Sequence, residues 1–106
     1  MSGMAEEGAL TLTVAYPTGG ESHVSCDSVR FQVPDSKDGK QRGGSVGIRR
    51  GHIDALMAVD EGDVLGFTGG REVFRRRVRG GLAIVSRNKV MILAESGSAE
   101  DAEEAE

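Results

Sequence analysis

This chain of 106 residues contains few of the residues that build disulfides, cysteine-rich metal sites or aromatic cores. Its one cysteine, Cys26, excludes an internal disulfide and a metal site made of several cysteines, and a single thiol suits a reducing compartment. Tryptophan is absent and only one tyrosine and three phenylalanines occur, so we expect a core of valine, isoleucine, leucine and methionine. No apolar run approaches the ~18 residues of a transmembrane helix. The N-terminal segment has two acids and no basic, apolar leader, so no secretory signal is expected.

Charge is distributed unevenly along the chain. The formal net charge is −4, from 13 basic and 17 acidic residues. Residues 95–106 carry six of the acids and no base, which leaves 13 bases and 11 acids in residues 1–94, a net charge of +2. We therefore expect residues 1–8 to be flexible and residues 96–106 to form an acidic tail that is disordered or makes one short helical segment.

Residues 9–95 alternate short apolar segments with turns rich in glycine. In residues 9–16 three aliphatic residues alternate with threonines, which is the period of a strand with one buried face. Further strands are expected at 23–26, 29–33, 53–59, 64–68 and 72–79, and two more flank a four-residue turn within 80–94. Residues 34–43 are polar and predict an exposed loop. No segment has a helical period, so the sequence predicts an all-β sandwich or barrel.

The chain shows no recognisable catalytic signature. Nucleophilic catalysis requires a nucleophile beside a base and an orienting group, and nothing of this kind surrounds Cys26 or His23. We interpret Cys26 as a half-buried strand residue and His23 as a strand surface residue. Residues 43–51 are glycine-rich, but they lack the lysine and hydroxyl of a phosphate loop and no helix follows them. Residues 60–63 lack the spacing of a calcium loop and predict a β-turn. We expect a binding protein with no cofactor, no metal and no enzymatic activity.

Two glycine-rich motifs carry a family resemblance. Residues 44–52 have the sequence G-S-V-G-I-R-R-G-H, and residues 80–95 have the sequence G-G-L-A-I-V-S-R-N-K-V-M-I-L-A-E. At this spacing the motifs resemble the epsilon subunit of F-type ATP synthases, over about residues 10–95. The resemblance implies a flattened β-sandwich of about ten short strands. It also implies a non-catalytic rotor component of the central stalk, at the cytoplasmic face of the bacterial inner membrane.

The resemblance implies two partners, the gamma subunit and the polar loops of the membrane c-ring. Through them the subunit would couple ion-driven ATP synthesis or ATP-driven ion pumping, with membrane contact only through the complex. The ring-facing loop corresponds to residues 45–52, with contacts at Ser45, Val46, Ile48, Arg49, Arg50 and His52. The gamma-facing side includes Tyr16 and Met57. Core packing is an equal alternative for Met57, as turn stabilisation is for His52.

The sequence departs from the family pattern in the ring-facing stretch and at the C-terminus. Family members commonly carry an acid where Ser45 stands, and an aromatic or aliphatic residue followed by proline where Arg49 and Arg50 stand. We therefore hypothesise that the cognate ring loop is acidic or neutral. Family members also continue into an inhibitory helical hairpin, whereas this sequence stops about ten residues after the sandwich. Residues 52–54 resemble a second type of F-type ATPase, often considered sodium-translocating, so proton and sodium both stay open.

Two other functions remain open on the sequence alone. The first is a β-sandwich that binds an unidentified protein. The second is a nucleic-acid-binding β-barrel, because the arginines of residues 75–79 can track a phosphate backbone. Against the second, only Phe74 offers an aromatic ring nearby, and a net charge of +2 is small for such a protein. The same arginines can instead protect a strand edge from pairing or meet acids on a partner subunit.

Overall fold

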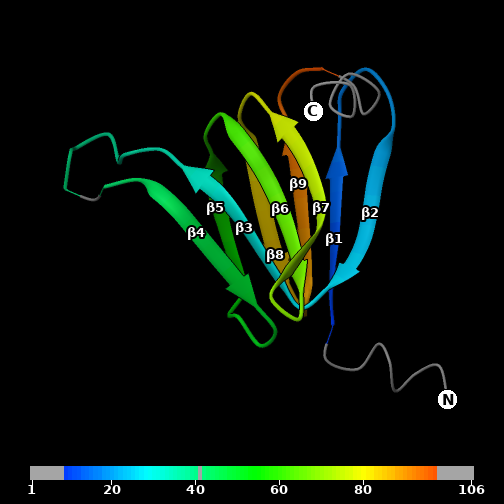
Figure 1. The fold of residues 1–106 in the computed structure, drawn as a ribbon. Coiled ribbons are helices and arrows are strands. Elements are labelled where there is room, and N and C mark those ends of the chain that lie inside the picture. Colours follow the sequence, from blue (N-terminus) through cyan, green and yellow to red (C-terminus); the bar gives the residue numbers. More distant parts are fainter. Residues whose placement is uncertain (1–8, 41, 98–106) are drawn as a thin grey trace, which may run out of the picture.

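The computed structural model describes residues 9–40 and 42–97, which contain nine strands and no helix (Figure 1). The strands are β1 (Leu10–Ala15), β2 (Glu21–Cys26), β3 (Ser28–Val33), β4 (Gly44–Arg49), β5 (Ala55–Val59), β6 (Gly62–Thr68), β7 (Arg71–Val78), β8 (Gly81–Ser86) and β9 (Lys89–Ala94). The all-β prediction is confirmed. Within these ranges the structure contains no helix that could span a membrane. The expectations for residues 1–8 and for most of the acidic tail lie outside the described residues.

The strands form two sheets that pack as a sandwich (Figure 1). Sheet A has the order β2-β1-β9-β8-β5, and sheet B has the order β4-β3-β6-β7. All neighbouring strands are antiparallel except β1 and β9, which are parallel. The chain first passes from sheet A to sheet B between β2 and β3, through the single residue Asp27. This arrangement leaves β2 and β5 as the edges of sheet A, and β4 and β7 as the edges of sheet B.

The core lies between the sheets and is filled by alternate residues of each strand. On β9, Val90, Ile92 and Ala94 are buried and the residues between them are exposed, because the pleat directs successive side chains to opposite faces. Burying one aliphatic side chain stabilises the fold by roughly 1.5–3 kcal/mol. The largest fully buried side chains are Phe31, Leu10, Leu12, Ile48, Ile92, Val14, Val29, Val64, Val85 and Val90. The core is thus mainly aliphatic as predicted, but it also contains the aromatic rings of Tyr16, Phe31 and Phe74, and methionine contributes only the half-buried Met57 among the described residues.

The hairpin of β8 and β9 shows how the second glycine-rich motif folds. Its turn is made by Arg87 (φ 52°) and Asn88 (φ 63°), and two consecutive positive φ values match the right-handed twist of the flanking strands. At the start of the motif, a Cβ on Gly81 would collide with the backbone carbonyl oxygen of Leu93. Glycine is therefore required where β8 approaches β9. The turn between these strands has two residues and not the four expected within residues 80–94, because Ser86 and Lys89 pair with each other as strand residues.

Some strand boundaries differ from those expected. β2 begins at Glu21, and β5 begins only at Ala55. β6 begins at Gly62, which shortens the turn predicted at 60–63 to Asp60 and Glu61. The first and last residues of a strand are set by its hydrogen bonds to the neighbouring strand. The side-chain pattern along one strand does not reveal these hydrogen bonds.

Candidate partner-binding surfaces

Five large apolar side chains lie exposed on the outer face of sheet A. We call them the apolar face: Leu56 of β5, Leu82 and Ile84 of β8, and Met91 and Leu93 of β9. Their exposed fractions range from 36% to 67%. A soluble protein rarely leaves a contiguous apolar surface in water, and such a surface marks a site of protein or membrane interaction.

The strand register makes the apolar face contiguous. Ile84 lies opposite Leu56 on one side and opposite Met91 on the other. In the next row, Leu82 lies opposite Leu93. Residues directly opposite each other share one face of the sheet, with Cβ atoms roughly 4.5–5.5 Å apart. The five side chains therefore form one patch across three adjacent strands.

The sequence of β8 and β9 explains why this patch exists. Both strands are apolar at successive positions, so Ala83, Val85 and the buried residues of β9 fill the core while their neighbours point outward. A strand that is apolar on both faces is typical of a sheet covered on both sides. Sequence reasoning missed these five residues, although the uninterrupted apolar runs within 82–85 and 90–94 contained the signal.

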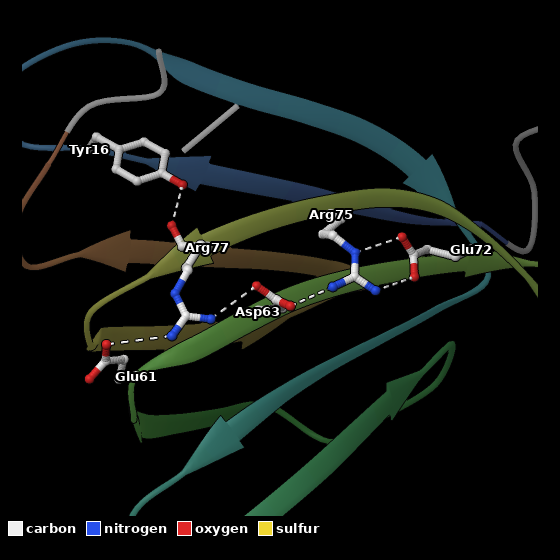
Figure 2. Close-up of polar contacts among 6 residues, drawn as sticks. All are labelled: Tyr16, Glu61, Asp63, Glu72, Arg75 and Arg77. Carbon is white, nitrogen blue, oxygen red and sulfur yellow. Dashed lines mark hydrogen bonds and ion pairs between the residues drawn. The ribbon is translucent and has the colours of Figure 1, made fainter. Parts of the chain in front are cut away.

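The two residues predicted to contact gamma lie elsewhere. Met57 is half-buried and packs against the core, because it alternates with the outward-facing Leu56 and Ala58. Tyr16 is only 8% exposed, and its hydroxyl donates a hydrogen bond to the backbone oxygen of Arg77 at 3.1 Å (Figure 2). Burial raises the pKa of this hydroxyl. Contact with gamma stays a prediction for both, and each offers a partner little surface.

Most of the stretch expected as a ring-facing loop is a strand. Residues 45–49 belong to β4, which pairs with β3 at the edge of sheet B. The expectation of a loop is wrong for these residues. Val46 and Ile48 alternate with outward-facing residues as in a strand, although glycines stand between and before them. Ile48 is fully buried and faces the core, so it has no surface for a partner. Val46 is half-buried against the core, whereas Ser45 is exposed.

The turn that follows β4 is fixed by its own hydrogen bonds. The backbone N–H of His52 donates to the backbone oxygen of Arg49 at 3.1 Å, and the His52 ring Nδ1 lies 2.7 Å from the backbone oxygen of Ile53. The N–H of Gly51 donates to Oδ1 of Asn88 at 2.8 Å, which ties the turn to the β8–β9 hairpin. His52 therefore stabilises the turn that presents Arg49 and Arg50.

Arg49 and Arg50 share a pocket with a third arginine, Arg30. The pocket has a volume of about 670 Å³. We call it the arginine pocket, and its lining is Asp27, Ser28, Arg30, Arg49, Arg50, Phe67 and Gly70. Sequence reasoning did not connect Arg30 with the other two arginines, because β3 and β4 are brought together only by the fold. Its lining residues lie at or beside the ends of β4 and β6 and the starts of β3 and β7, and these strand ends lie at the same end of the sandwich (Figure 1).

Unlike the pocket arginines, two arginines of β7 are paired with carboxylates, which come from β6, from β7 and from the turn before β6 (Figure 2). Nε and Nη2 of Arg75 each donate to Glu72 at 2.9 Å, and Nη1 donates to Asp63. Arg77 lies 3.5 Å from both Asp63 and Glu61. We call these five residues the ion-pair ladder. The hydrogen bonds from Arg75 lower the pKa of the Glu72 carboxyl.

Arg76 and Arg79 complete the description of the arginines predicted to track nucleic acid. Nε of Arg76 donates to Oγ of Ser22, on β2 of sheet A, at 3.2 Å. Its guanidinium lies 4.6 Å from the ring centroid of Phe74, on its own strand β7. Arg79 is exposed. Three carboxylates beside Arg75 and Arg77 leave the ladder with no positive excess, which disfavours binding of a phosphate backbone there.

Two further reactive side chains, Cys26 and His23, lie on β2. Cys26 is 3% exposed, more buried than expected, and burial raises the pKa of its thiol. His23 lies on the surface of β2 as predicted, 3.1 Å from Glu21 and 3.1 Å from Thr13. Within residues 9–40 and 42–97, no three His, Cys, Asp or Glu side chains are grouped so that they could hold a metal ion.

Comparison with known proteins assigns no family. No protein-family model and no curated protein sequence matches the chain. The features that bear on function are therefore the two motifs, the fold, the apolar face of sheet A and the arginine pocket of sheet B.

Proposed function

We propose that this protein is a non-catalytic stalk subunit of the epsilon type, which couples the gamma subunit of a rotary F-type ATP synthase to its c-ring. The observation that carries the proposal is the apolar face, because the motif of residues 80–95 builds four of its five residues. The other motif, residues 44–52, builds β4 and the turn with Arg49 and Arg50. Both motifs that resemble the epsilon family thus form exposed surfaces.

The apolar face is the proposed docking surface for gamma. Five aliphatic or thioether side chains in adjacent rows provide apolar area without a charged residue among them. Permanent interfaces are more apolar than transient ones, and they resemble a domain core cut in half. A permanently bound gamma subunit would remove this surface from water.

The edge strand β4 and its following turn are the proposed contact with the c-ring. Ser45, Arg49 and Arg50 are exposed there, whereas Ile48 contributes to the core beneath them. The absence of the usual acid at Ser45, together with the two arginines at Arg49 and Arg50, favours an acidic or neutral ring loop, as the sequence suggested. Close packing between the sheets gives the body the low compressibility that torque transmission requires.

Cross-linking tests the ring contact. Ser45→Cys introduces an exposed thiol on β4, and in the assembled complex we expect it to cross-link to cysteines placed in the c-ring loop. A cysteine at Val73, which is exposed on β7, is the matched control and should not cross-link. An arginine-dominated ring loop at the Ser45 cross-link would contradict the charge argument.

A second candidate function is a β-sandwich that binds a different protein. The apolar face alone favours it, since its side chains fit any apolar partner surface. The two candidates differ in the partner. A protein that binds neither gamma nor the c-ring, but associates through Ile84 and Met91 with another protein, would establish the second candidate.

A further inference from the structure

Three guanidinium groups in the arginine pocket have no carboxylate partner within the described residues. Arg30, Arg49 and Arg50 form no ion pair there, in contrast to Arg75 and Arg77 on the same sheet. The one acid in the lining, Asp27, accepts a hydrogen bond at 3.0 Å from the backbone N–H of Gly69. The lining therefore carries three positive charges and one negative charge.

The register of sheet B brings these arginines together. Ser28 of β3 lies opposite Arg49 of β4 on one side and opposite Phe67 of β6 on the other. Arg30 follows two positions along β3, so its side chain is on the same face as that of Ser28. The Arg30 guanidinium lies 5.8 Å from the ring centroid of Phe67. A hydroxyl and one ring face thus lie beside the guanidinium groups.

The backbone that carries the arginines is held on two sides. β3 lies between β4 and β6, and the turn after Arg49 is bonded to Asn88 through Gly51. The cationic groups consequently belong to a fixed frame and do not depend on a loose loop. Positive charges that line one pocket repel one another, and an anion bound among them would offset this repulsion.

We propose that the arginine pocket binds an oligophosphate, supplied either as an inorganic chain or as the polyphosphate of a nucleotide. Each guanidinium presents five N–H donors in a planar fork that fits phosphate oxygens in pairs. Three such groups offer more donors than the two oxygens of one carboxylate accept, whereas a di- or triphosphate supplies several oxygens and several negative charges. The volume of about 670 Å³ lies within the range of small-molecule sites.

This inference does not rest on the proposed stalk function, because it concerns the isolated protein. The pocket shares Arg49 and Arg50 with the proposed c-ring contact, so the test uses the protein before assembly. It is tested by titrating the full-length protein with sodium tripolyphosphate and, separately, with ATP in the absence of divalent metal. Binding is measured by calorimetry and by backbone amide shifts, at low salt. Sodium sulfate at matched ionic strength is the control anion.

The matched variants are Arg30→Gln/Arg49→Gln and, as the control, Arg42→Gln/Arg79→Gln. All four arginines are exposed and each pair removes the same charge, but only the first pair lines the pocket. We expect saturable one-to-one binding that weakens about tenfold or more in the first variant, because charge-assisted bidentate contacts are lost. The control variant should change affinity by less than about threefold, through long-range charge alone.

Amide shifts confined to residues 27–30, 49–50 and 67–70 would support the pocket. Tighter binding of ATP than of tripolyphosphate, with shifts at Phe67, would assign the nucleotide as the source, and equal binding would assign the phosphate chain. The proposal is overturned by an equal loss in both variants, by non-saturating shifts at all basic residues, or by no binding at low salt. Amide spectra of each variant verify that it is folded.

Discussion

Leu56 lies directly opposite Ile84 across the pair β5 and β8, and both side chains point away from the core. The adjacent residue on β5, Met57, points inward and packs against the core. Because the side-chain period of a strand is two, a shift of one residue in β5 would exchange these roles. The register of β5 therefore decides which residues can meet a partner.

The first prediction concerns the centre of the apolar face. Ile84→Glu places a charge between Leu56 and Met91, and burying it against a partner would leave it unpaired. We expect the affinity for gamma to fall at least tenfold, measured by calorimetry or size-exclusion chromatography. The free protein should remain folded, because Ile84 is 37% exposed.

Val73→Glu is the matched control for this change. Val73 is also an exposed β-branched residue, but it lies on β7 of sheet B. It should leave the affinity for gamma unchanged within about twofold. Equal losses in the two variants would mean that the apolar face is not the docking surface.

The second prediction concerns the contact that joins the sheets at Tyr16. Tyr16→Phe removes the hydroxyl that donates to the backbone oxygen of Arg77, so the free energy of unfolding should fall by about 0.5–1.5 kcal/mol. Urea denaturation measures this difference. An unchanged midpoint and slope would show that the hydrogen bond contributes nothing to stability.

The same residue predicts a pH dependence. Burial raises the pKa of the folded Tyr16 hydroxyl above its ordinary value, with an opposing effect of the Arg76 charge. Above about pH 10 the unfolded tyrosine ionises while the folded one keeps its proton, so ionisation favours unfolding. Stability should therefore fall more steeply with rising pH in the wild type than in Tyr16→Phe. Parallel curves for the two proteins would exclude a contribution from Tyr16.

The third prediction concerns the ion-pair ladder. Asp63 lies within ion-pair distance of both Arg75 and Arg77, so Glu61→Gln/Asp63→Asn/Glu72→Gln removes every carboxylate of the ladder. We expect wild-type binding to single-stranded DNA to be weak at ~150 mM salt, and the triple variant to bind about tenfold more tightly, with a steeper salt dependence. Fluorescence anisotropy of a labelled oligonucleotide measures both.

Tight wild-type binding that the triple substitution leaves unchanged would mean that the ladder does not restrain these arginines. Glu100→Gln/Asp101→Asn/Glu103→Gln, in the acidic C-terminal segment, is the control of equal charge change. A similar gain in that variant would assign the effect to net charge alone.

Local sequence patterns predicted the strands, because alternation and turn chemistry act over few residues. The turn at Arg87 and Asn88 needs positive φ at both positions, and asparagine readily adopts it. The family resemblance led us to expect a loop at residues 45–52, although Val46 and Ile48 of β4 keep the period of a strand on either side of Gly47. Here the ladder with β3 overrides the weak strand propensity of glycine.

The surfaces were harder to predict, because each depends on pairing between distant segments. Met57 was selected as a contact and Leu56 was not, since the sequence does not specify which face of β5 is inside. Arg30 joins Arg49 only through the pairing of β3 with β4, and Asp63 meets Arg75 only through the pairing of β6 with β7. The residues of a surface can be recognised singly, but their grouping requires the register.

The measurement that tests the proposed function most directly is size-exclusion chromatography of this protein with the gamma subunit from the same genome, at low salt and at about 1 M salt. At 1 M salt the Debye length is about 3 Å, so exposed ionic contacts are screened while apolar burial persists. We predict a one-to-one complex at both salt concentrations. Separate elution of two folded proteins, or a complex that dissociates at high salt, would contradict docking through the apolar face.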